Sequence, residues 1–144
     1  ACPTCALAIR AFEALLVEYR DRMQQHRVQL TRMLMFFSTN AFIYEPTFLW
    51  EDEQTIYHRR VYPAALLPKV PEHPANPAGR ALVKELKGRI QELCSRNGAS
   101  HMQVGKDYPY LASRKPETRA LVEDLKRLLD PDRLLNPGAL GLPL

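Results

Sequence analysis

The residues whose types and spacing best suit chemistry lie in one segment, GASHMQVGKDYPYL, residues 98–111. Two glycines flank its middle part, and polar or aromatic side chains gather around them: Gly98, His101, Gln103, Gly105, Lys106, Tyr108 and Tyr110. A glycine beside a lysine at a strand end lets a ligand approach the backbone closely. The same pattern is typical of an exposed strand end with solvated polar residues. The residue pattern alone leaves both interpretations open.

A second candidate region is AFIYEPTFLW, residues 41–50, where Glu45 stands among aromatic and β-forming residues. A carboxyl group buried there would have a raised pKa, whereas one on the polar face of a strand would be solvated. Successive strand residues face opposite sides, so Tyr44 and Glu45 cannot both line one pocket in regular geometry. Trp50 fits packing in the core as well as contact with a substrate.

The sequence contains no phosphate loop, no zinc-binding helix motif and no nucleophile elbow. Cys2 and Cys5 form a CxxC pair, but a structural zinc site needs four ligands and no second pair is present. We therefore predict no metal site and interpret the pair as small residues at the start of a helix. The odd total of three cysteines favours a reducing compartment, and so a cytoplasmic location.

Length and charge limit the function classes further. A chain of 144 residues fits one domain. Its twenty basic residues are interleaved with sixteen acidic ones, so it lacks the cationic stripe that nucleic-acid binding needs. No apolar run approaches the roughly 20 residues that span a membrane. Because the sequence opens on Ala1 and runs directly into a helical pattern, we expect it to be part of a longer protein.

Hydrophobic periodicity predicts the elements of the first half. Apolar residues three and four apart predict a helix that ends near His26, and alternation predicts strands over residues 28–36 and 41–50 around a turn at 38–40. Pro46 cannot donate to a ladder, so the second strand should be an edge strand, bulge or end there. Residues 51–75 should form a long connection with one helical turn.

The second half begins with a helix that Asn76 and Pro77 should open and Gly98 should end. A short strand is expected over residues 99–104, and a last helix should run from Pro116 to Asp130. Helices alternating with a few strands predict an α+β fold, in which the helices pack on one face of an antiparallel sheet.

Two motifs together resemble the FAD-linked oxidase C-terminal domain, the cap domain of the family that contains vanillyl-alcohol oxidase, glycolate oxidase and D-lactate dehydrogenase. The first is QVGKDYPY at residues 103–110, and the second is LKRLLDPDRLLNPG at residues 125–138. The second motif matches the closing pattern of the family at Lys126, Asp130, Pro131, Asn136, Pro137 and Gly138. FIYEPTFLW also looks like a strand of the substrate-side sheet. Where many members have GHGxG, this chain has SHMQVGK, which weakens the glycolate and D-lactate assignment and leaves the aromatic-alcohol relatives open.

The resemblance implies an FAD-dependent oxidoreductase that oxidises an alcohol or 2-hydroxy acid by hydride transfer to the flavin. Residues 1–129 would be the C-terminal portion of a ferredoxin-like cap domain, and residues 130–144 a tail that returns toward the FAD-binding domain. That domain is not in this chain, so the chain alone should be inactive and retain no FAD. Its partners would be the missing domain, a small alcohol or hydroxy-acid substrate and, through exposed apolar surface, a second copy.

The resemblance also implies roles for the candidate residues. Lys106 would stabilise negative charge on the reduced flavin or on a substrate carboxylate, and one of His101, Tyr108 and Tyr110 would bind or deprotonate the substrate hydroxyl. Asn136 would hydrogen-bond the flavin edge or, alternatively, cap the turn of the tail, with Gly105 beside the cofactor. Substrate contacts are expected from Tyr44, Glu45, Trp50 and Gln103. The alternative function is a non-catalytic interaction or subunit-assembly domain.

Overall fold

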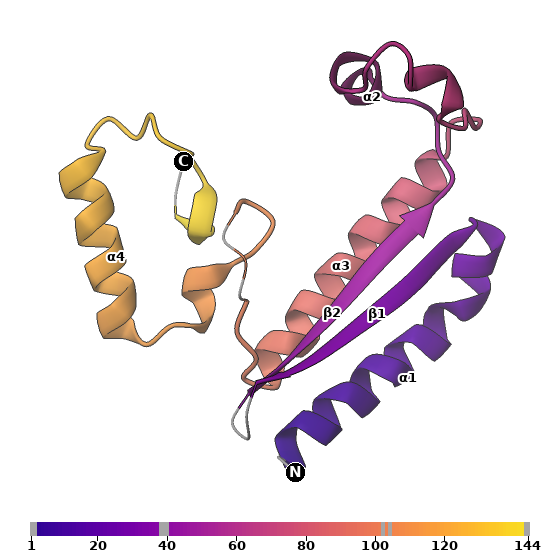
Figure 1. The fold of residues 1–144 in the computed structure, drawn as a ribbon. Helices are drawn as coiled ribbons and strands as arrows, with labels where there is room; N and C mark the ends of the chain where they lie inside the picture. The colour runs from indigo at the N-terminus through magenta and orange to yellow at the C-terminus, as the bar shows by residue number, and fades with distance from the viewer. Residues whose placement is uncertain (1–2, 38–40, 102, 104, 143–144) are drawn as a thin grey trace. The chain divides into compact units, whose positions relative to one another are not determined.

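The computed structural model describes residues 3–37, 41–101, 103 and 105–142 (Figure 1). Its contacts divide the chain into two compact units, residues 10–89 and residues 1–9 with 90–144. In the described part of the chain, four α-helices accompany one two-stranded antiparallel sheet. The α+β class predicted from the sequence is therefore confirmed.

The sheet lies in the unit formed by residues 10–89. Helix α1 (Pro3–Gln25) leads into strand β1 (Val28–Phe37), which pairs antiparallel with β2 (Ala41–Trp50). The register continues without a break through Pro46, which lies opposite Arg32. β2 is an edge strand, so its ladder tolerates a proline. Of the three outcomes expected at Pro46, the edge strand is correct. The turn predicted at residues 38–40 lies outside the described residues.

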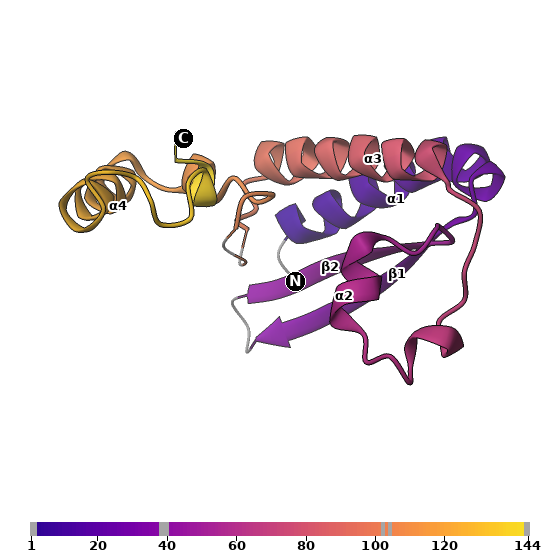
Figure 2. The same ribbon diagram turned by 90° about the horizontal axis from the view of Figure 1, so that it is seen from above.

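Helix α3 (Pro77–Arg96) and helix α1 lie on the same side of this sheet (Figure 2). The edge of Phe12 on α1 meets the ring of Tyr44 on β2, with 4.6 Å between ring centroids. Tyr19 and Arg22 of α1 both donate to Glu85 of α3. The buried side chains of this unit recur on α1 and α3 at helical spacing: Phe12, Leu15, Leu16, Tyr19, Val28, Leu82, Val83 and Leu86. The order helix, strand, strand, helix is the middle of a ferredoxin-like arrangement.

Both predicted ends of α3 are confirmed by their backbone contacts. Asn76 caps the start, because its Oδ1 accepts from the backbone N–H of Gly79 at 2.8 Å. At the other end, Gly98 has φ +68°, its N–H donates to the Ser95 carbonyl, and the N–H of Ala99 donates to the Cys94 carbonyl at 2.9 Å. This pair of bonds is a Schellman motif, which a glycine without a Cβ adopts at little cost.

A long connection with one helical turn was predicted between β2 and α3. The connection contains α2 (Ile56–Val61) and the short 3-10 helix η1 (Leu67–Lys69). The backbone N–H of Thr55 donates to Nδ1 of His58 at 3.0 Å, which fixes the start of α2.

The second unit has no strand in the part that the structure describes, so the strand predicted at residues 99–104 is wrong for residues 99–101 and 103. Met102 and Val104 lie outside the described residues. A strand needs a hydrogen-bonded neighbour, and the sheet of the described chain contains only β1 and β2. The segment instead leads into 3-10 helix η2 (Tyr110–Ser113), helix α4 (Pro116–Leu129) and 3-10 helix η3 (Ala139–Gly141).

Candidate functional site

In the second unit, the tail folds back onto the segment that contains most of the candidate residues. The backbone N–H of Leu140 donates to the carbonyl of Gly105 at 3.2 Å. Gly141 has φ +80°, and a Cβ at this position would lie 3.7 Å from the Cα of Pro109. The 3-10 helices η2 and η3 also contact each other. The GKDYPY segment, residues 105–110, and the NPGALG segment, residues 136–141, therefore lie side by side although they are distant in the sequence.

Three of the four predicted catalytic residues make ring contacts in this segment, in two pairs that are linked by the effect of the Arg114 charge on the pKa of His101. The imidazole of His101 lies 5.9 Å from the ring of Tyr108, measured between centroids. The guanidinium carbon of Arg114 lies 4.4 Å from the centroid of the Tyr110 ring, within the range of a cation–π interaction. We call His101, Tyr108, Tyr110 and Arg114 the His101–Arg114 cluster.

Two nitrogens of this cluster are buried and have no hydrogen-bond partner: Nε2 of His101 and Nε of Arg114. Burial lowers the pKa of His101, and the positive charge of Arg114 lowers it further. At neutral pH the imidazole is therefore neutral, with one nitrogen able to accept a proton. Another nitrogen of Arg114 donates to Oγ of Ser113 at 3.2 Å, and Ser113 in turn donates to the Tyr110 carbonyl at 3.0 Å.

The fourth predicted catalytic residue, Lys106, and the predicted substrate residue Gln103 both have exposed side chains. Lys106 follows Gly105, whose carbonyl is occupied by the tail. Its neighbour Asp107 accepts from Nε2 of Gln91 through its backbone carbonyl at 2.5 Å, which ties this loop to the end of α3. The positive charge of Lys106 is thus carried by a loop that is fixed at two backbone positions.

Asn136 lies in the turn of the tail with φ +45°, and its carbonyl accepts from the N–H of Ala139 at 3.1 Å. Its side chain is exposed. Asn136 was expected either to hydrogen-bond the flavin edge or to cap the turn of the tail. The backbone of Asn136, and not its side chain, makes the turn, so the side chain is available for another contact. Asparagine tolerates this left-handed backbone better than most residues.

The tail before Asn136 is organised by Asp130, whose exposed fraction is only 6%. Its carboxylate accepts from the backbone N–H groups of Leu134 at 2.9 Å and Leu135 at 3.1 Å, and from Nζ of Lys126. Nζ of Lys126 also donates to the Leu135 carbonyl at 2.5 Å. The hydrogen bond from Lys126, together with those from the two backbone N–H groups, holds the pKa of Asp130 below its usual value against the effect of burial.

The remaining predicted substrate residues lie in the other unit. Tyr44 faces α1, donates to Oε1 of Glu13 at 3.3 Å, and has its pKa raised by burial to about 12. Glu45 lies opposite Met33 on the other face of the sheet, so the prediction that Tyr44 and Glu45 do not share a pocket is confirmed. Trp50 is 37% exposed, which makes the core interpretation wrong for this residue.

The indole of Trp50 belongs to a polar joint that residue patterns did not reveal. Its Nε1 donates to Oδ2 of Asp52 at 3.0 Å, while Oδ1 of Asp52 accepts from the backbone N–H of Asn76 at 2.8 Å. Nδ2 of Asn76 donates to the carbonyls of His26 and Glu51 at 3.0 and 3.1 Å. We call Trp50, Asp52 and Asn76, with the groups they bind, the Asn76 joint.

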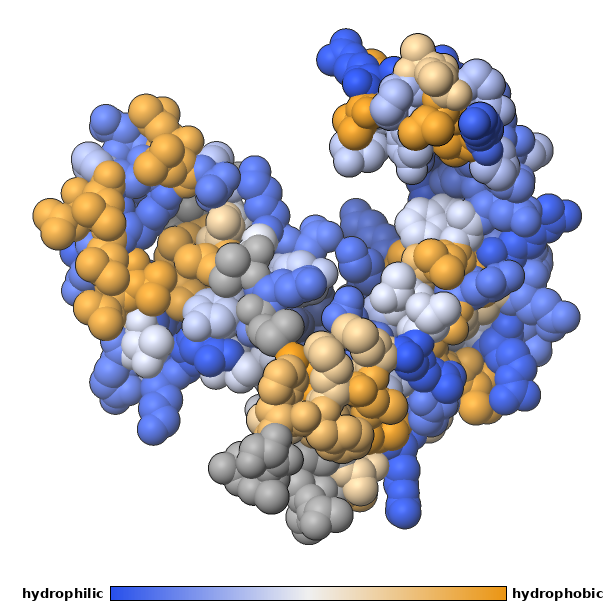
Figure 3. Space-filling model, in the orientation of Figure 1, coloured by the Kyte–Doolittle hydropathy of each residue, from blue (hydrophilic) through white to orange (hydrophobic). Residues whose placement is uncertain are grey.

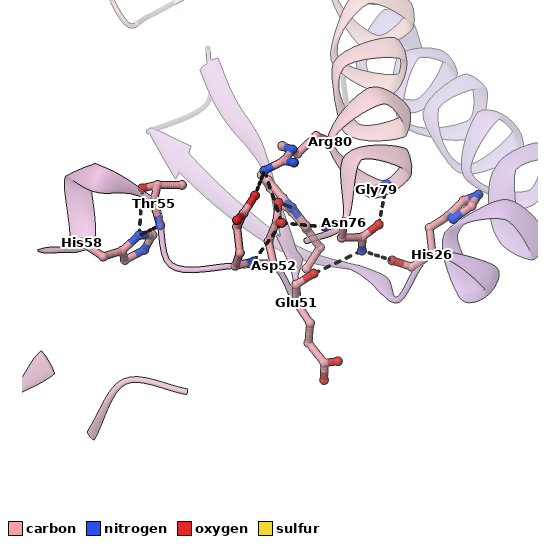
Figure 4. Close-up of polar contacts among 10 residues, drawn as sticks. His26, Glu51, Asp52, Thr55, His58, Asn76, Gly79 and Arg80 are labelled. Carbon is pink, nitrogen blue, oxygen red and sulfur yellow. Dashed lines mark hydrogen bonds and ion pairs between the residues drawn. The ribbon is translucent and has the colours of Figure 1, made fainter. Parts of the chain in front are cut away.

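The Asn76 joint ties the end of β2 to the turn after α1 and to the start of α3 (Figure 4). Burial opposes ionisation of Asp52, but hydrogen bonds from Asn76 and Trp50 hold its pKa below the usual value. Arg80 lies 3.4 Å from Oδ1 of Asp52 and from Oε1 of Glu53. Because its polar groups bind one another, we interpret this joint as structural.

The same unit has a groove of about 860 Å³ between α1 and the end of the sheet. Its walls combine apolar side chains with three arginines: Leu16, Val17, Arg20, Met23, Arg27, Leu30 and Arg32. Arg32 is paired with Glu13 at 3.2 Å and Arg27 with Glu51 at 2.7 Å. Sequence periodicity marked the apolar face of α1 but could not indicate that part of that face borders an open groove.

No family model, curated protein or solved structure matches this chain. The described residues include no helix that is long and apolar enough to cross a membrane. Across the same residues, no three His, Cys, Asp or Glu side chains are grouped so that they could hold a metal ion.

Proposed function

We propose that this chain is the C-terminal portion of the substrate-side cap domain of an FAD-dependent oxidoreductase. The enzyme would oxidise an alcohol or a 2-hydroxy acid by hydride transfer to flavin. The observation that supports this most strongly is the contact between Gly105 and Leu140. It joins Gly105 of the first motif to the tail two residues after the end of the second motif, so the segment with most of the candidate residues and the tail fold against each other.

The architecture of the tail supports the same proposal. In the motif LKRLLDPDRLLNPG, Asp130 accepts two backbone N–H groups that follow Pro131, and Lys126 neutralises its charge. These contacts give a structural reason for the lysine at position 126 and the aspartate at position 130, two of the positions that match the closing pattern of the family. They also hold the segment that leads to Asn136, whose exposed side chain is available to the flavin edge.

Both units expose apolar side chains, and this supports the proposal that each unit packs against a partner. In the second unit, leucines gather over α4 and the segment after it (Figure 3), with exposed side chains at Leu121, Leu125, Leu128, Leu129, Leu134 and Leu135. In the other unit, Met33, Phe37 and Leu49 are exposed on the face of the sheet that points away from α1. Surfaces of this kind fit a chain that docks onto the flavin-binding half and the rest of the cap sheet.

The described residues fit only one part of FAD. They offer polar groups for the flavin ring and for a substrate beside it, but no glycine-rich loop that would hold the pyrophosphate. When bound, the flavin would supply the hydride acceptor. Neutral His101 would take the proton of the substrate hydroxyl at Nε2, and the hydroxyls of Tyr108 and Tyr110 would orient that group. Lys106 would supply positive charge from its exposed position.

The test is the visible absorption spectrum of the longer protein that contains this segment. Yellow protein with flavin bands, bleached anaerobically by a 2-hydroxy acid or an aromatic alcohol, is the expected result. His101→Gln should slow bleaching by about 100-fold, in line with the loss of a general base. The matched control His73→Gln changes a histidine of the β2–α3 connection and should leave the rate unchanged. Colourless protein in which no added FAD is retained would exclude the proposal.

The alternative, a non-catalytic assembly domain, is favoured by one observation, which is the row of exposed leucines over α4 and the following segment. Under this alternative the longer protein carries no flavin, yet the chain forms a stable complex of defined stoichiometry. Light scattering on the same preparation that is used for the spectrum separates the two functions.

A further inference from the structure

The groove beside α1 meets β1 along its edge, and not at one of its faces. Three consecutive residues of the strand, Val28, Gln29 and Leu30, line this groove. Successive side chains of a strand point to opposite faces of the sheet, so a groove that touches all three runs along the edge of the strand. In the described chain β1 pairs with β2 alone. The second edge of β1 therefore presents the N–H and carbonyl groups of alternate residues with no strand beside them.

The two strands of the sheet differ in how well their outer edges are protected against pairing with another chain. β2 contains Pro46 and the charged residue Glu45 near its middle, and a proline cannot donate to a second ladder. β1 has ten residues, VQLTRMLMFF, with no proline, no lysine and no acidic residue, and its register with β2 is unbroken. Long edges without such residues accept added strands readily. The edge of β1 is therefore the one open to a further strand.

The walls of the groove carry an excess of positive charge. Three arginines line the groove, Arg20, Arg27 and Arg32, together with two carboxylates, Glu13 and Glu51. Arg27 and Arg32 bind these carboxylates in exposed ion pairs. Arg20 is exposed, and no hydrogen bond or ion pair joins it to another described residue. One positive charge in the groove is therefore left without a negative partner in the described chain.

A second copy of this chain does not fit these charges. The only charged residue of β1 is Arg32, so a second β1 laid along the first would add positive charge and no carboxylate. Like charges that face each other across two strands destabilise their pairing. An extended segment with acidic and apolar side chains fits better. Its backbone extends the ladder, its carboxylates bind arginines of the groove, and its apolar side chains contact the apolar wall of α1.

We propose that the edge of β1 binds an extended, acidic segment of a partner protein, which joins the sheet as a third strand. Leu30 and Arg32 lie two residues apart and share one face of β1, and the ion pair of Arg32 with Glu13 shows that this face points toward α1. On this face the added strand places apolar side chains against Leu30 and Val17 and a carboxylate beside Arg20. The inference does not rest on the proposed flavin chemistry, because it uses only groups of the unit formed by residues 10–89.

The test titrates the 144-residue chain with the peptide acetyl-TETVTET-amide, which as a strand places two glutamates and a valine on one face. A matched probe, acetyl-TKTVTKT-amide, reverses the charge. A fully N-methylated version of the acidic peptide keeps the charge but has no backbone N–H to donate to the ladder. Trp50 is the single tryptophan of the chain and lines the groove, so its fluorescence reports binding. We expect a saturable change with the acidic peptide and with neither of the other two.

Hydrogen exchange followed by NMR locates the added strand. The amides of β1 that do not bond to β2 should exchange more slowly in the complex, and those at the outer edge of β2 should not change.

Variants test the charge of the groove. Arg20→Gln should weaken binding about threefold to fivefold, because one exposed ion pair with the peptide is lost. The control Arg10→Gln removes an exposed arginine of the same helix that does not line the groove, and it should bind like the original chain. Unchanged amide spectra show that both variants are folded.

Four results in the folded chain would overturn the proposal: no response to the acidic peptide, equal binding of the lysine peptide, undiminished binding of the N-methylated peptide, or equal losses in Arg20→Gln and Arg10→Gln. Slow exchange of the outer β1 amides without peptide would assign the edge to a second copy instead. The longer protein that contains this segment should bind the acidic peptide as well. Failure of that protein alone would show that its own remainder covers the edge, which also excludes the proposal.

Discussion

The Asn76 joint and the His101–Arg114 cluster are both partly buried groups of polar side chains, but they differ in how their hydrogen bonds are satisfied. In the joint, Asn76 donates to two carbonyls and accepts from one N–H, and Asp52 accepts from Trp50 and from the backbone. In the cluster, one nitrogen of His101 and one of Arg114 have no partner. The hydrogen bonds of the first group are therefore made within the chain, whereas in the second group two buried nitrogens are left without a partner among the described residues.

Whether the buried polar atoms have partners distinguishes the two groups better than their residue types do. A histidine, an arginine and aromatic side chains occur in or near both groups, so composition alone ranks them equally. A buried polar atom that lacks a partner costs free energy, about 1–3 kcal/mol in typical cases. Substitution in the joint should therefore destabilise the fold, and substitution in the cluster should not.

The largest expected effect is that of Asn76→Ala. The change removes the cap of α3 and two hydrogen bonds to the carbonyls of His26 and Glu51. A lost cap costs about 1 kcal/mol and each neutral hydrogen bond a similar amount, so the free energy of unfolding should fall by about 2–3 kcal/mol. Urea denaturation followed by circular dichroism measures it.

The control for this variant is Asn97→Ala at the other end of the same helix. Asn97 donates one hydrogen bond, from Nδ2 to the Leu93 carbonyl at 2.8 Å, so its loss should cost about 1 kcal/mol or less. Equal losses for Asn76→Ala and Asn97→Ala would show that the joint has no special role.

A second prediction concerns acid. Arg22 and Tyr19 donate to the carboxylate of Glu85 and lower its pKa to about 2 from 4.5. Because the folded pKa is depressed, the stabilisation is fully present above pH 4.5 and is lost as pH falls toward 2. Glu85→Gln should therefore lower the thermal midpoint at pH 7 and bring the two proteins together near pH 2. A difference that stays constant from pH 7 to pH 2 would contradict the assigned ionisation.

The parts of the fold that the sequence predicts well are those with local causes. Asn76 and Gly98 were identified as the ends of α3 because a cap and a left-handed backbone depend on neighbouring residues only. Pro46 limited its strand to three outcomes, an edge strand, a bulge or an end, for a similarly local reason, which is its missing N–H. The strand expected at residues 99–104 failed because alternation of side chains does not show whether a partner strand exists.

The candidate site was only partly predictable, for the same reason. His101, Tyr108 and Tyr110 stood out as chemical residue types in a glycine-flanked segment. Arg114 did not, since its importance depends on the absence of an acidic neighbour in space. Asp130 was matched as part of a motif, but its hydrogen bonds to Leu134 and Leu135 appear only once the tail is folded.

A third prediction tests the exposed leucines over α4, which belong to neither group. Leu128 is 77% exposed, so Leu128→Asn should change the free energy of unfolding by no more than about 0.5 kcal/mol. It should nevertheless reduce self-association, because the apolar surface available to a second copy becomes smaller. Sedimentation velocity over a range of concentrations measures this. Lys84→Asn, an exposed change on α3, is the control and should leave association unaltered.

The smallest expected effect on stability is that of Arg114→Gln, which tests the comparison between the Asn76 joint and the His101–Arg114 cluster most directly. Arg114→Gln should leave the free energy of unfolding unchanged within about 0.5 kcal/mol, because the arginine makes no ion pair within the described chain. It should raise the pKa of His101 toward its usual value of 6.5, since the charge of Arg114 contributes to the lowered pKa, although burial contributes more. The charged group that acts on the imidazole is Arg114, and Tyr108 is the ring packed beside it.

A proton NMR titration of the His101 ring measures this shift, with Arg119→Gln as the control that should not move it. Because the folded pKa of His101 is depressed, its neutral form favours the folded state above pH 6.5, and that contribution is lost as pH falls through the folded value. An unchanged pKa of His101 in Arg114→Gln, or an equal rise in Arg119→Gln, would show that the charge of Arg114 does not act on this imidazole.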